Sequence, residues 1–145
     1  MTRKAGPSRP VALLAAVLVA LVVAGCGAAA PTAPPSSNAA ALPLTVSVAV
    51  ADEMQQAGDL VLDVREPSEW VAGHIAGATL IPLGDLATRL GELPRDRTIV
   101  VVCHSGNRSA QGRDILRQAG FTSVTSMAGG MTAWLAAGLP VVAGS

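Results

Sequence analysis

The residues best suited to chemistry form the segment 103–109, Cys-His-Ser-Gly-Asn-Arg-Ser, which directly follows the apolar run 98–102. A β-branched run of this kind predicts a buried strand, and it would place Cys103 at the carboxyl end, where open α/β sheets carry their sites. Backbone N–H groups of the loop and of the next helix can then surround the sulfur. Such an environment favours thiolate over thiol and attracts an anionic substrate. The segment therefore predicts sulfur chemistry at Cys103.

The loop after Cys103 is expected to stabilise a negative sulfur through its backbone, as an oxyanion hole does. Gly106 would let this ring close, because one loop position is expected to need a positive φ. Ser109 suits the N-cap of the helix that follows. The predicted substrate-binding residues are His104, Ser105, Gly106, Asn107, Arg108 and Ser109.

Two side chains of this loop leave alternatives open. Arg108 could hold an anionic donor by matching two oxygens with its guanidinium fork, which we favour, or it could pair with Asp63 or another carboxylate. His104 could act as a base, but neighbouring residues on a curved loop usually point apart, and a thiolate stabilised by amides needs no base. We therefore interpret His104 as an exposed residue that tunes access or acceptor preference.

Asp63 and Arg65 lie at the end of another predicted strand, two residues apart and so on one face. They could be active-site neighbours, but we favour an ion pair that holds the loops above the sheet. The chain has only two histidines and no close acidic cluster beside Cys103, so a metal site has little support. No organic cofactor is expected either.

Predicted strands and helices alternate along the second part of the chain, which indicates a parallel sheet with helices on both faces. The expected strands cover 44–48, 60–64, 79–81, 98–102 and 123–126. The expected helices cover 51–57, 67–72, 86–90 (with Asp85 as N-cap), 109–119 and 131–137.

The first residues of the chain are typical of an export signal. Three basic residues precede the apolar run 11–23, whose thirteen residues are too few for a bilayer-spanning helix, which needs roughly 20. The segment 23–26, Val-Ala-Gly-Cys, resembles the lipobox of bacterial lipoproteins. This resemblance implies a signal peptide over 1–25 and a diacylglycerol anchor on Cys26. The alternatives are ordinary secretion with cleavage after 28–30, or a retained membrane anchor.

Residues 26–43 are rich in Ala, Pro, Ser and Thr, which predicts an extended tether in front of one domain over 44–145. From Cys26 onward the chain keeps seven Arg, no Lys and ten acidic residues, a net charge of −3. Without a basic patch, a nucleic-acid partner is not expected. Because Cys26 is lipidated or lies on the tether, Cys103 is expected to be a free thiol in an oxidising compartment, which needs a chemical reason.

The order of short motifs along the chain resembles a rhodanese domain. The motifs lie at 63–66, 69–70, 73–78, 81–82, 102–103, 106–109, 120–121, 129–131, 134 and 138–140. The resemblance spans about 44–142 and implies a five-stranded parallel sheet with flanking helices. It also implies transfer of the outer sulfur of thiosulfate or a persulfide to a thiophilic acceptor, through a persulfide on Cys103. By the same resemblance His74 is a structural histidine, hydrogen-bonded within a turn. Separately, we expect Trp134 in the core and Trp70 in the core or at a pocket edge.

The length of the loop after Cys103 distinguishes the predicted sulfurtransferase from phosphatases and arsenate reductases of similar fold. Four residues stand between Cys103 and Arg108, whereas the similar rhodanese-like phosphatases and arsenate reductases carry one residue more, which makes room for a tetrahedral oxyanion. The shorter loop favours sulfur transfer. Together, the two resemblances imply a lipid-anchored sulfurtransferase on the outer face of a bacterial membrane, with a thiosulfate-like donor and a thiol or cyanide acceptor, and we expect it to be a monomer. The alternative is a sulfur carrier or a redox-sensing binding module without fast turnover.

Overall fold

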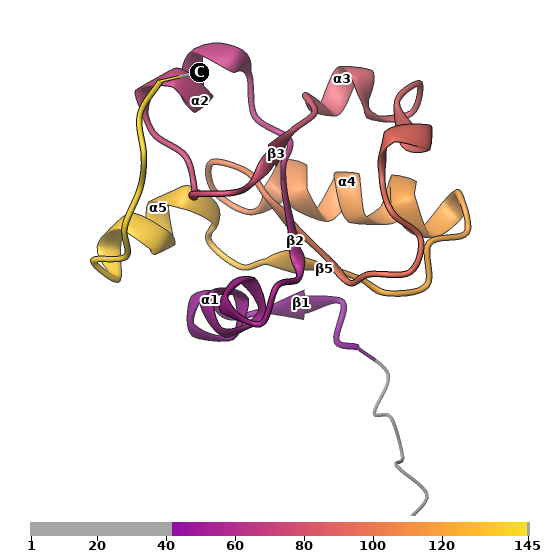
Figure 1. Cartoon of the computed structure of the whole chain (residues 1–145), viewed down its shortest axis with the longest axis horizontal. Helices are drawn as coiled ribbons and strands as arrows, with labels where there is room; N and C mark the ends of the chain where they lie inside the picture. The colour runs from indigo at the N-terminus through magenta and orange to yellow at the C-terminus, as the bar shows by residue number, and fades with distance from the viewer. Residues whose placement is uncertain (1–41, 145) are drawn as a thin grey trace, which may run out of the picture. The chain divides into compact units, whose positions relative to one another are not determined.

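The computed structural model describes residues 42–144 (Figure 1). The predicted signal peptide, Cys26 and the tether up to residue 41 lie outside these residues. The described strands are β1 (Thr45–Val46), β2 (Leu60–Asp63), β3 (Thr79–Leu80), β4 (Ile99–Val102) and β5 (Val124–Met127). The helices are α1 (Val48–Gln56), α2 (Pro67–Ala72), α3 (Leu83–Leu86), α4 (Asn107–Gln118) and α5 (Gly130–Ala136), with the 3-10 helix η1 (Leu90–Glu92). None of the helices described combines the length and apolar composition that crossing a membrane requires.

The five strands form one parallel sheet in the order β1-β5-β4-β2-β3, which confirms the predicted fold class. In this order β2 and β4 are neighbours, with β3 on the far side of β2 and β5 on the far side of β4. The chain therefore turns in opposite directions after β2 and after β4. Connections that diverge in this way open a crevice at the carboxyl ends of the two strands. Asp63 pairs in register with Val102, so Asp63 and Cys103 both lie at this crevice.

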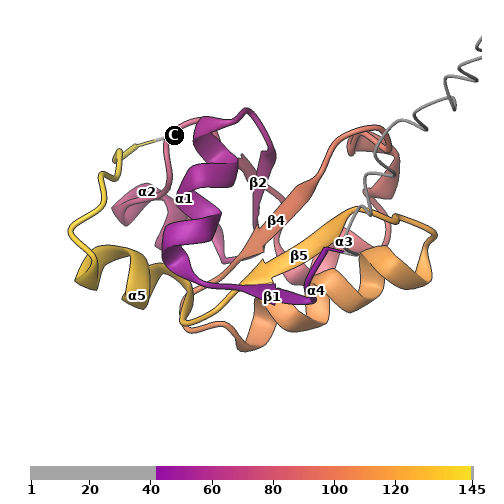
Figure 2. The same ribbon diagram turned by 90° about the horizontal axis from the view of Figure 1, so that it is seen from below.

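Side chains of β4 alternate between the two faces of the sheet. Ile99 and Val101 belong to one core cluster, and Val100 and Val102 belong to the other. Figure 2 shows α1 and α5 on one side of the sheet and α4 on the other. Leu116 of α4 packs in the cluster of Ile99 and Val101. Ala51 of α1 and Met131 and Trp134 of α5 pack in the cluster of Val100 and Val102 on the other face.

Several predicted elements were wrong in their bounds. The first helix begins at Val48 because the Ser47 hydroxyl caps it and accepts a bond from the Val50 N–H at 3.3 Å, which shortens the preceding strand to two residues. The helix predicted over 86–90 ends at Leu86. It begins after Pro82, so Asp85 lies inside the helix rather than at its N-cap.

Candidate active site

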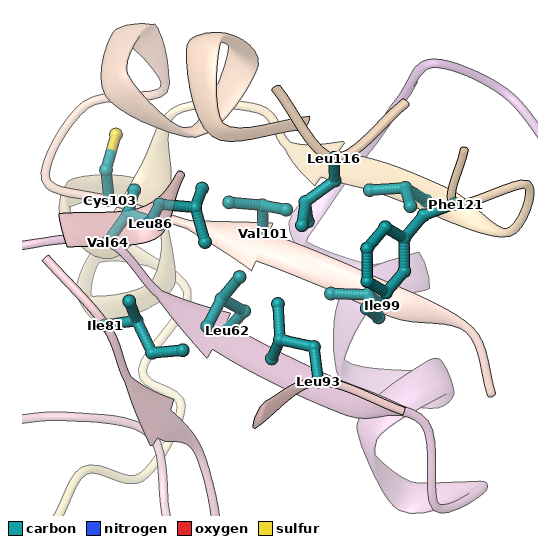
Figure 3. Close-up of a cluster of buried hydrophobic side chains, with 11 residues drawn as sticks. Leu62, Val64, Ile81, Leu86, Leu93, Ile99, Val101, Cys103, Leu116 and Phe121 are labelled. Atoms are coloured by element: carbon teal, nitrogen blue, oxygen red, sulfur yellow. The ribbon is translucent and has the colours of Figure 1, made fainter. Parts of the chain in front are cut away.

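Cys103 follows β4 directly, and only 1 % of the residue is exposed. Its sulfur points away from the aliphatic side chains of the core cluster (Figure 3). The Gly106 N–H donates to the sulfur at 3.1 Å, and the Ser109 hydroxyl oxygen lies 3.6 Å from it. The end of β4 and the first turn of α4 thus enclose the thiol between hydrogen-bonding groups.

Opposing effects act on the ionisation of Cys103. Burial raises the pKa of the thiol, because it disfavours the charged form. Hydrogen bonds from the Ser109 side chain and from the backbone N–H groups of Ser109, Gly106 and Ser105 favour the thiolate. The hydrogen bonds outweigh burial, so the pKa of Cys103 lies below its ordinary value. Of the six predicted amide donors, these three act on the sulfur.

Gly106 and Ser109 shape the start of α4. Gly106 has a φ of 104°, the left-handed conformation, and it occupies the N-cap position. The prediction that Ser109 is the N-cap was therefore wrong, since the helix begins two residues earlier. The buried Ser109 hydroxyl donates instead to the Gly106 carbonyl at 2.8 Å, which also accepts a bond from the Ala110 N–H. The hydroxyl can consequently turn toward a thiolate without leaving that carbonyl unpaired.

The start of α5 is hydrogen-bonded to the backbone of the loop that begins at Cys103. The Met131 N–H donates to the Cys103 carbonyl at 2.7 Å, and the Thr132 N–H donates to the His104 carbonyl at 3.0 Å. The Thr132 hydroxyl donates to the same carbonyl at 3.0 Å. These bonds fix the carbonyls of the loop away from the sulfur, which leaves the N–H groups of the following residues to face it. The sequence analysis missed this support, although the Gly-Gly pair at 129–130 is its signal.

Asp63 and Arg65 form a buried ion pair, with the Arg65 Nη2 atom 2.6 Å from a carboxylate oxygen of Asp63. The Arg65 Nε–H donates to both carboxylate oxygens, at 3.0 and 2.9 Å. Arg65 also donates to the carbonyl of Gly73 at 2.8 Å. The pair thereby ties the end of β2 to the end of α2, as in the structural alternative that the sequence analysis favoured.

Arg108 pairs with Glu69, a carboxylate that lies in one of the motifs but was not predicted as its partner. Its two terminal nitrogens donate to the two oxygens of Glu69, at 2.8 and 2.9 Å. The bonds from Arg108 hold the pKa of the Glu69 carboxyl at about 2, although partial burial opposes them. Glu69 also accepts a bond from the Glu66 N–H at the start of α2. Helix α2 therefore presents Glu69 to the loop at a fixed place.

A groove of about 520 Å³ lies beside the loop, between α2, α5 and the C-terminal segment 138–144. His104 reaches it, with 64 % of its side chain exposed and its Nδ1 atom 3.8 Å from a Glu69 oxygen. The C-terminal segment is held by paired backbone bonds between His74 and Val142, both at 2.9 Å. The lining residues are Arg65, Glu69, Ala72, Gly73, His104, Met131, Thr132, Leu135 and Val141.

Three further predictions concern Trp134, Trp70 and His74. Trp134 is buried in the core, with 1 % of the residue exposed. The half-buried Trp70 stacks on the His74 ring, with 3.5 Å between ring centroids. The His74 Nδ1 atom lies 3.0 Å from the Trp70 carbonyl, so this histidine is bonded within the turn that follows α2.

We expect iodoacetamide to alkylate Cys103 at half its maximal rate at a lower pH than it does an exposed cysteine. The reason is that the thiolate is the nucleophile and the pKa of Cys103 is lowered. Ser109→Ala should move this midpoint to higher pH, because it removes a donor to the thiolate. Glu69 stays ionised throughout, since its pKa is about 2. The measurement is the modified fraction of the Cys103 peptide against time and pH. Ser123→Ala, which removes an exposed hydroxyl before β5, is the control, and an equal shift in both variants would contradict the assignment.

Comparison with known proteins identifies the family. The model of the rhodanese-like domain matches residues 47–137. The chain belongs to the rhodanese-like family. A sulfurtransferase of Allochromatium vinosum is 40 % identical to this rhodanese-like chain over 84 residues, which cover 58 % of this chain and 78 % of that protein. The thiosulfate sulfurtransferase GlpE of Pseudoalteromonas translucida is 37 % identical over 93 residues, covering 63 % and 89 %.

Solved structures agree with this assignment. The crystal structure of a rhodanese-related protein from Thermoplasma volcanium has a TM-score of 0.65 and 37 % identity to this rhodanese-like chain. The match covers 69 % of this chain and 98 % of that one. The described domain thus has the rhodanese fold, and sulfurtransferases are among its relatives.

Proposed function

We propose that this rhodanese-like protein moves sulfane sulfur from a small donor to a thiophilic acceptor through a persulfide on Cys103. The observation that carries the proposal is the buried Cys103 sulfur, which accepts the Gly106 N–H at 3.1 Å and has a lowered pKa. Sulfurtransferases among the relatives support the same chemistry. The proposed mechanism uses no metal ion and no organic cofactor.

The reaction has two displacement steps at sulfur. The Cys103 thiolate attacks the outer sulfur of thiosulfate or of a persulfide, and a new sulfur–sulfur bond forms while the donor's own bond breaks. The electron pair of the broken bond leaves with sulfite or with the donor's thiolate. An acceptor thiolate or cyanide then attacks the outer sulfur of the Cys103 persulfide and restores the Cys103 thiolate. Sulfane sulfur moves in both steps, and no external oxidant or reductant is needed.

The loop suits a persulfide better than a larger oxyanion. In both the resting and loaded states the negative charge rests on sulfur, and the N–H groups of Ser105, Gly106 and Ser109 offer it preorganised donors. Four residues separate Cys103 from Arg108, one fewer than in the similar phosphatases and arsenate reductases. The short ring favours sulfur transfer over phosphate or arsenate chemistry.

The proposal is tested by the intact mass of the purified protein after incubation with thiosulfate or with a persulfide donor. We expect a gain of one sulfur atom at Cys103, and its loss as thiocyanate appears when cyanide is added. A gain without catalytic turnover would favour the sulfur-carrier alternative. Failure to gain sulfur from either donor would contradict sulfur transfer.

We also propose that the protein is exported and anchored by lipid at Cys26, as the lipobox-like segment 23–26 suggests. An anchored monomer would work on the outer face of the membrane. We expect Cys26→Ser to move the protein from the membrane fraction to the soluble fraction of its host. The measurement is immunoblotting of both fractions together with labelling by a fatty-acid analogue. A variant that stays in the membrane and keeps the label would contradict the anchor.

A further inference from the structure

We infer that Glu69 sets the donor preference of the site, so that Cys103 accepts sulfur from an organic persulfide with an apolar body in preference to thiosulfate. The inference rests on the proposed sulfur transfer at Cys103. The geometry of Arg108, the charges around the crevice and the lining of the groove support it separately.

The guanidinium group best placed to receive an anionic donor is already engaged. Both terminal nitrogens of Arg108 donate to Glu69, at 2.8 and 2.9 Å. This side-by-side arrangement is the one that a sulfonate group would need for two parallel bonds. Thiosulfate must therefore displace the carboxylate of Glu69, or bind without the fork of Arg108.

The charges around the crevice disfavour a dianion. The buried Arg65 is matched by Asp63, and Arg108 is matched by Glu69. Glu66, whose charge also acts on Arg108, adds a third carboxylate against two guanidinium groups. The thiolate of Cys103 contributes one more negative charge. Thiosulfate carries two negative charges into this field, whereas a persulfide carries at most one and reacts as its neutral form, so repulsion lowers the encounter rate of thiosulfate more than that of the persulfide.

The groove beside the loop suits an apolar body. Its walls include Ala72 of α2, Met131 and Leu135 of α5, and Val141 of the C-terminal segment. Leu135 is 56 % exposed and Val141 is 38 % exposed, so a ligand that covers them removes apolar surface from water. His104 lines the same groove and is the neighbour of Cys103 in the chain. Cys103 itself is buried and is not among the lining residues, so the outer sulfur of a persulfide bound in the groove must reach past the loop to the thiolate.

The experiment compares thiosulfate with benzyl persulfide as donors to the purified full-length protein. The second-order rate of sulfur loading on Cys103 is measured by acid quench and intact mass. We expect the wild type to load faster from benzyl persulfide, with benzyl thiolate as the leaving group. Glu69→Gln should raise the rate from thiosulfate by about tenfold, through a tighter apparent affinity for thiosulfate, and should change the rate from benzyl persulfide by less than about twofold.

Salt provides a second measurement that does not depend on a variant. Repulsion between like charges is screened by salt, so the thiosulfate rate of the wild type should rise with ionic strength. The rise should be smaller in Glu69→Gln.

The apolar wall of the groove is tested by Leu135→Ser. This variant should lower the rate from benzyl persulfide about fivefold relative to the rate from thiosulfate, because it removes apolar surface from the groove only.

The matched control is Glu92→Gln. Glu92 forms the same kind of two-bond pair with Arg89, at 2.7 Å for each bond, but it lies on η1 and does not line the groove. We expect both donors to behave as in the wild type. Preference of the wild type for thiosulfate, a thiosulfate rate that falls with salt, or a slower thiosulfate rate in Glu69→Gln would each overturn the inference while sulfur transfer stands. Failure of both donors to load Cys103 would overturn sulfur transfer itself.

Discussion

Replacement of Cys103 by serine is expected to abolish sulfur loading and to leave the fold in place. A serine hydroxyl is not ionised at neutral pH and is a poor nucleophile toward sulfane sulfur, so neither step of the transfer can begin. The serine oxygen can still accept the Gly106 N–H, which donates to the Cys103 sulfur at 3.1 Å. The free energy of unfolding should therefore change by about 1 kcal/mol or less. Intact mass after incubation with donor and a urea unfolding curve measure the two effects.

Cys26→Ser is the matched control for this experiment, since the chain has two cysteines and Cys26 lies outside the described domain. It should load one sulfur atom as the wild type does. Sulfur retained by Cys103→Ser would show that another group carries it. Loss of loading together with unfolding would instead show that Cys103 is needed for the fold, and the urea curve separates these results.

The fold could be predicted from local patterns wherever a single pattern dominates. Residues 98–102 are apolar or β-branched without interruption, and they contain β4, which is buried on both faces. Helix α2 follows from Pro67 at its first position and from Glu66 before it. The short helix α3 was misplaced because Pro82 can end a strand or precede a helix equally well. Ser109 was misplaced because Gly106, in the left-handed conformation, begins α4 earlier.

The site could be predicted only as far as its contacts are local in sequence. The amide donors to Cys103 come from the six residues that follow it, so spacing alone locates them. Glu69 lies 39 residues before Arg108, and several carboxylates compete for that arginine, so the packing of α2 decides the pair. The bonds from α5 to the loop likewise join residues that only the tertiary structure brings together. The sequence shows a motif at 129–131 but not what it touches.

Gly130→Ala is expected to be strongly destabilising and to impair the sulfur site. Gly130 has a φ of 55°, and an added Cβ atom would lie 2.3 Å from the Cys103 carbonyl oxygen and 2.7 Å from that of His104. Both neighbours are backbone atoms of the loop, so they cannot turn aside as a side chain would. Relief requires that α5 or the loop shift, which breaks the 2.7 Å bond from the Met131 N–H to Cys103. We expect a loss of about 3 kcal/mol in the free energy of unfolding.

The same shift should move the amide donors away from the sulfur. Displacement of a reacting group by about 1 Å can cost on the order of 100-fold in rate, so the folded fraction of Gly130→Ala should load sulfur about 100 times more slowly. Gly138→Ala is the matched control, because Gly138 also has a positive φ, 70°, but an added Cβ meets nothing within 4 Å. That variant should lose only about 1 kcal/mol, from backbone strain, and load normally.

Urea unfolding curves and quenched loading assays on both glycine variants separate the two roles of the α5 start. Equal stability losses in Gly130→Ala and Gly138→Ala would contradict the close packing of α5 on the loop. A large loss in Gly130→Ala with normal loading by the folded protein would mean that α5 stabilises the domain without orienting the amide donors. A large loss with slow loading would mean that the support from α5 is part of the site. In that case the Gly-Gly pair at 129–130 is needed for sulfur transfer because it lets a helix approach the nucleophile's own backbone.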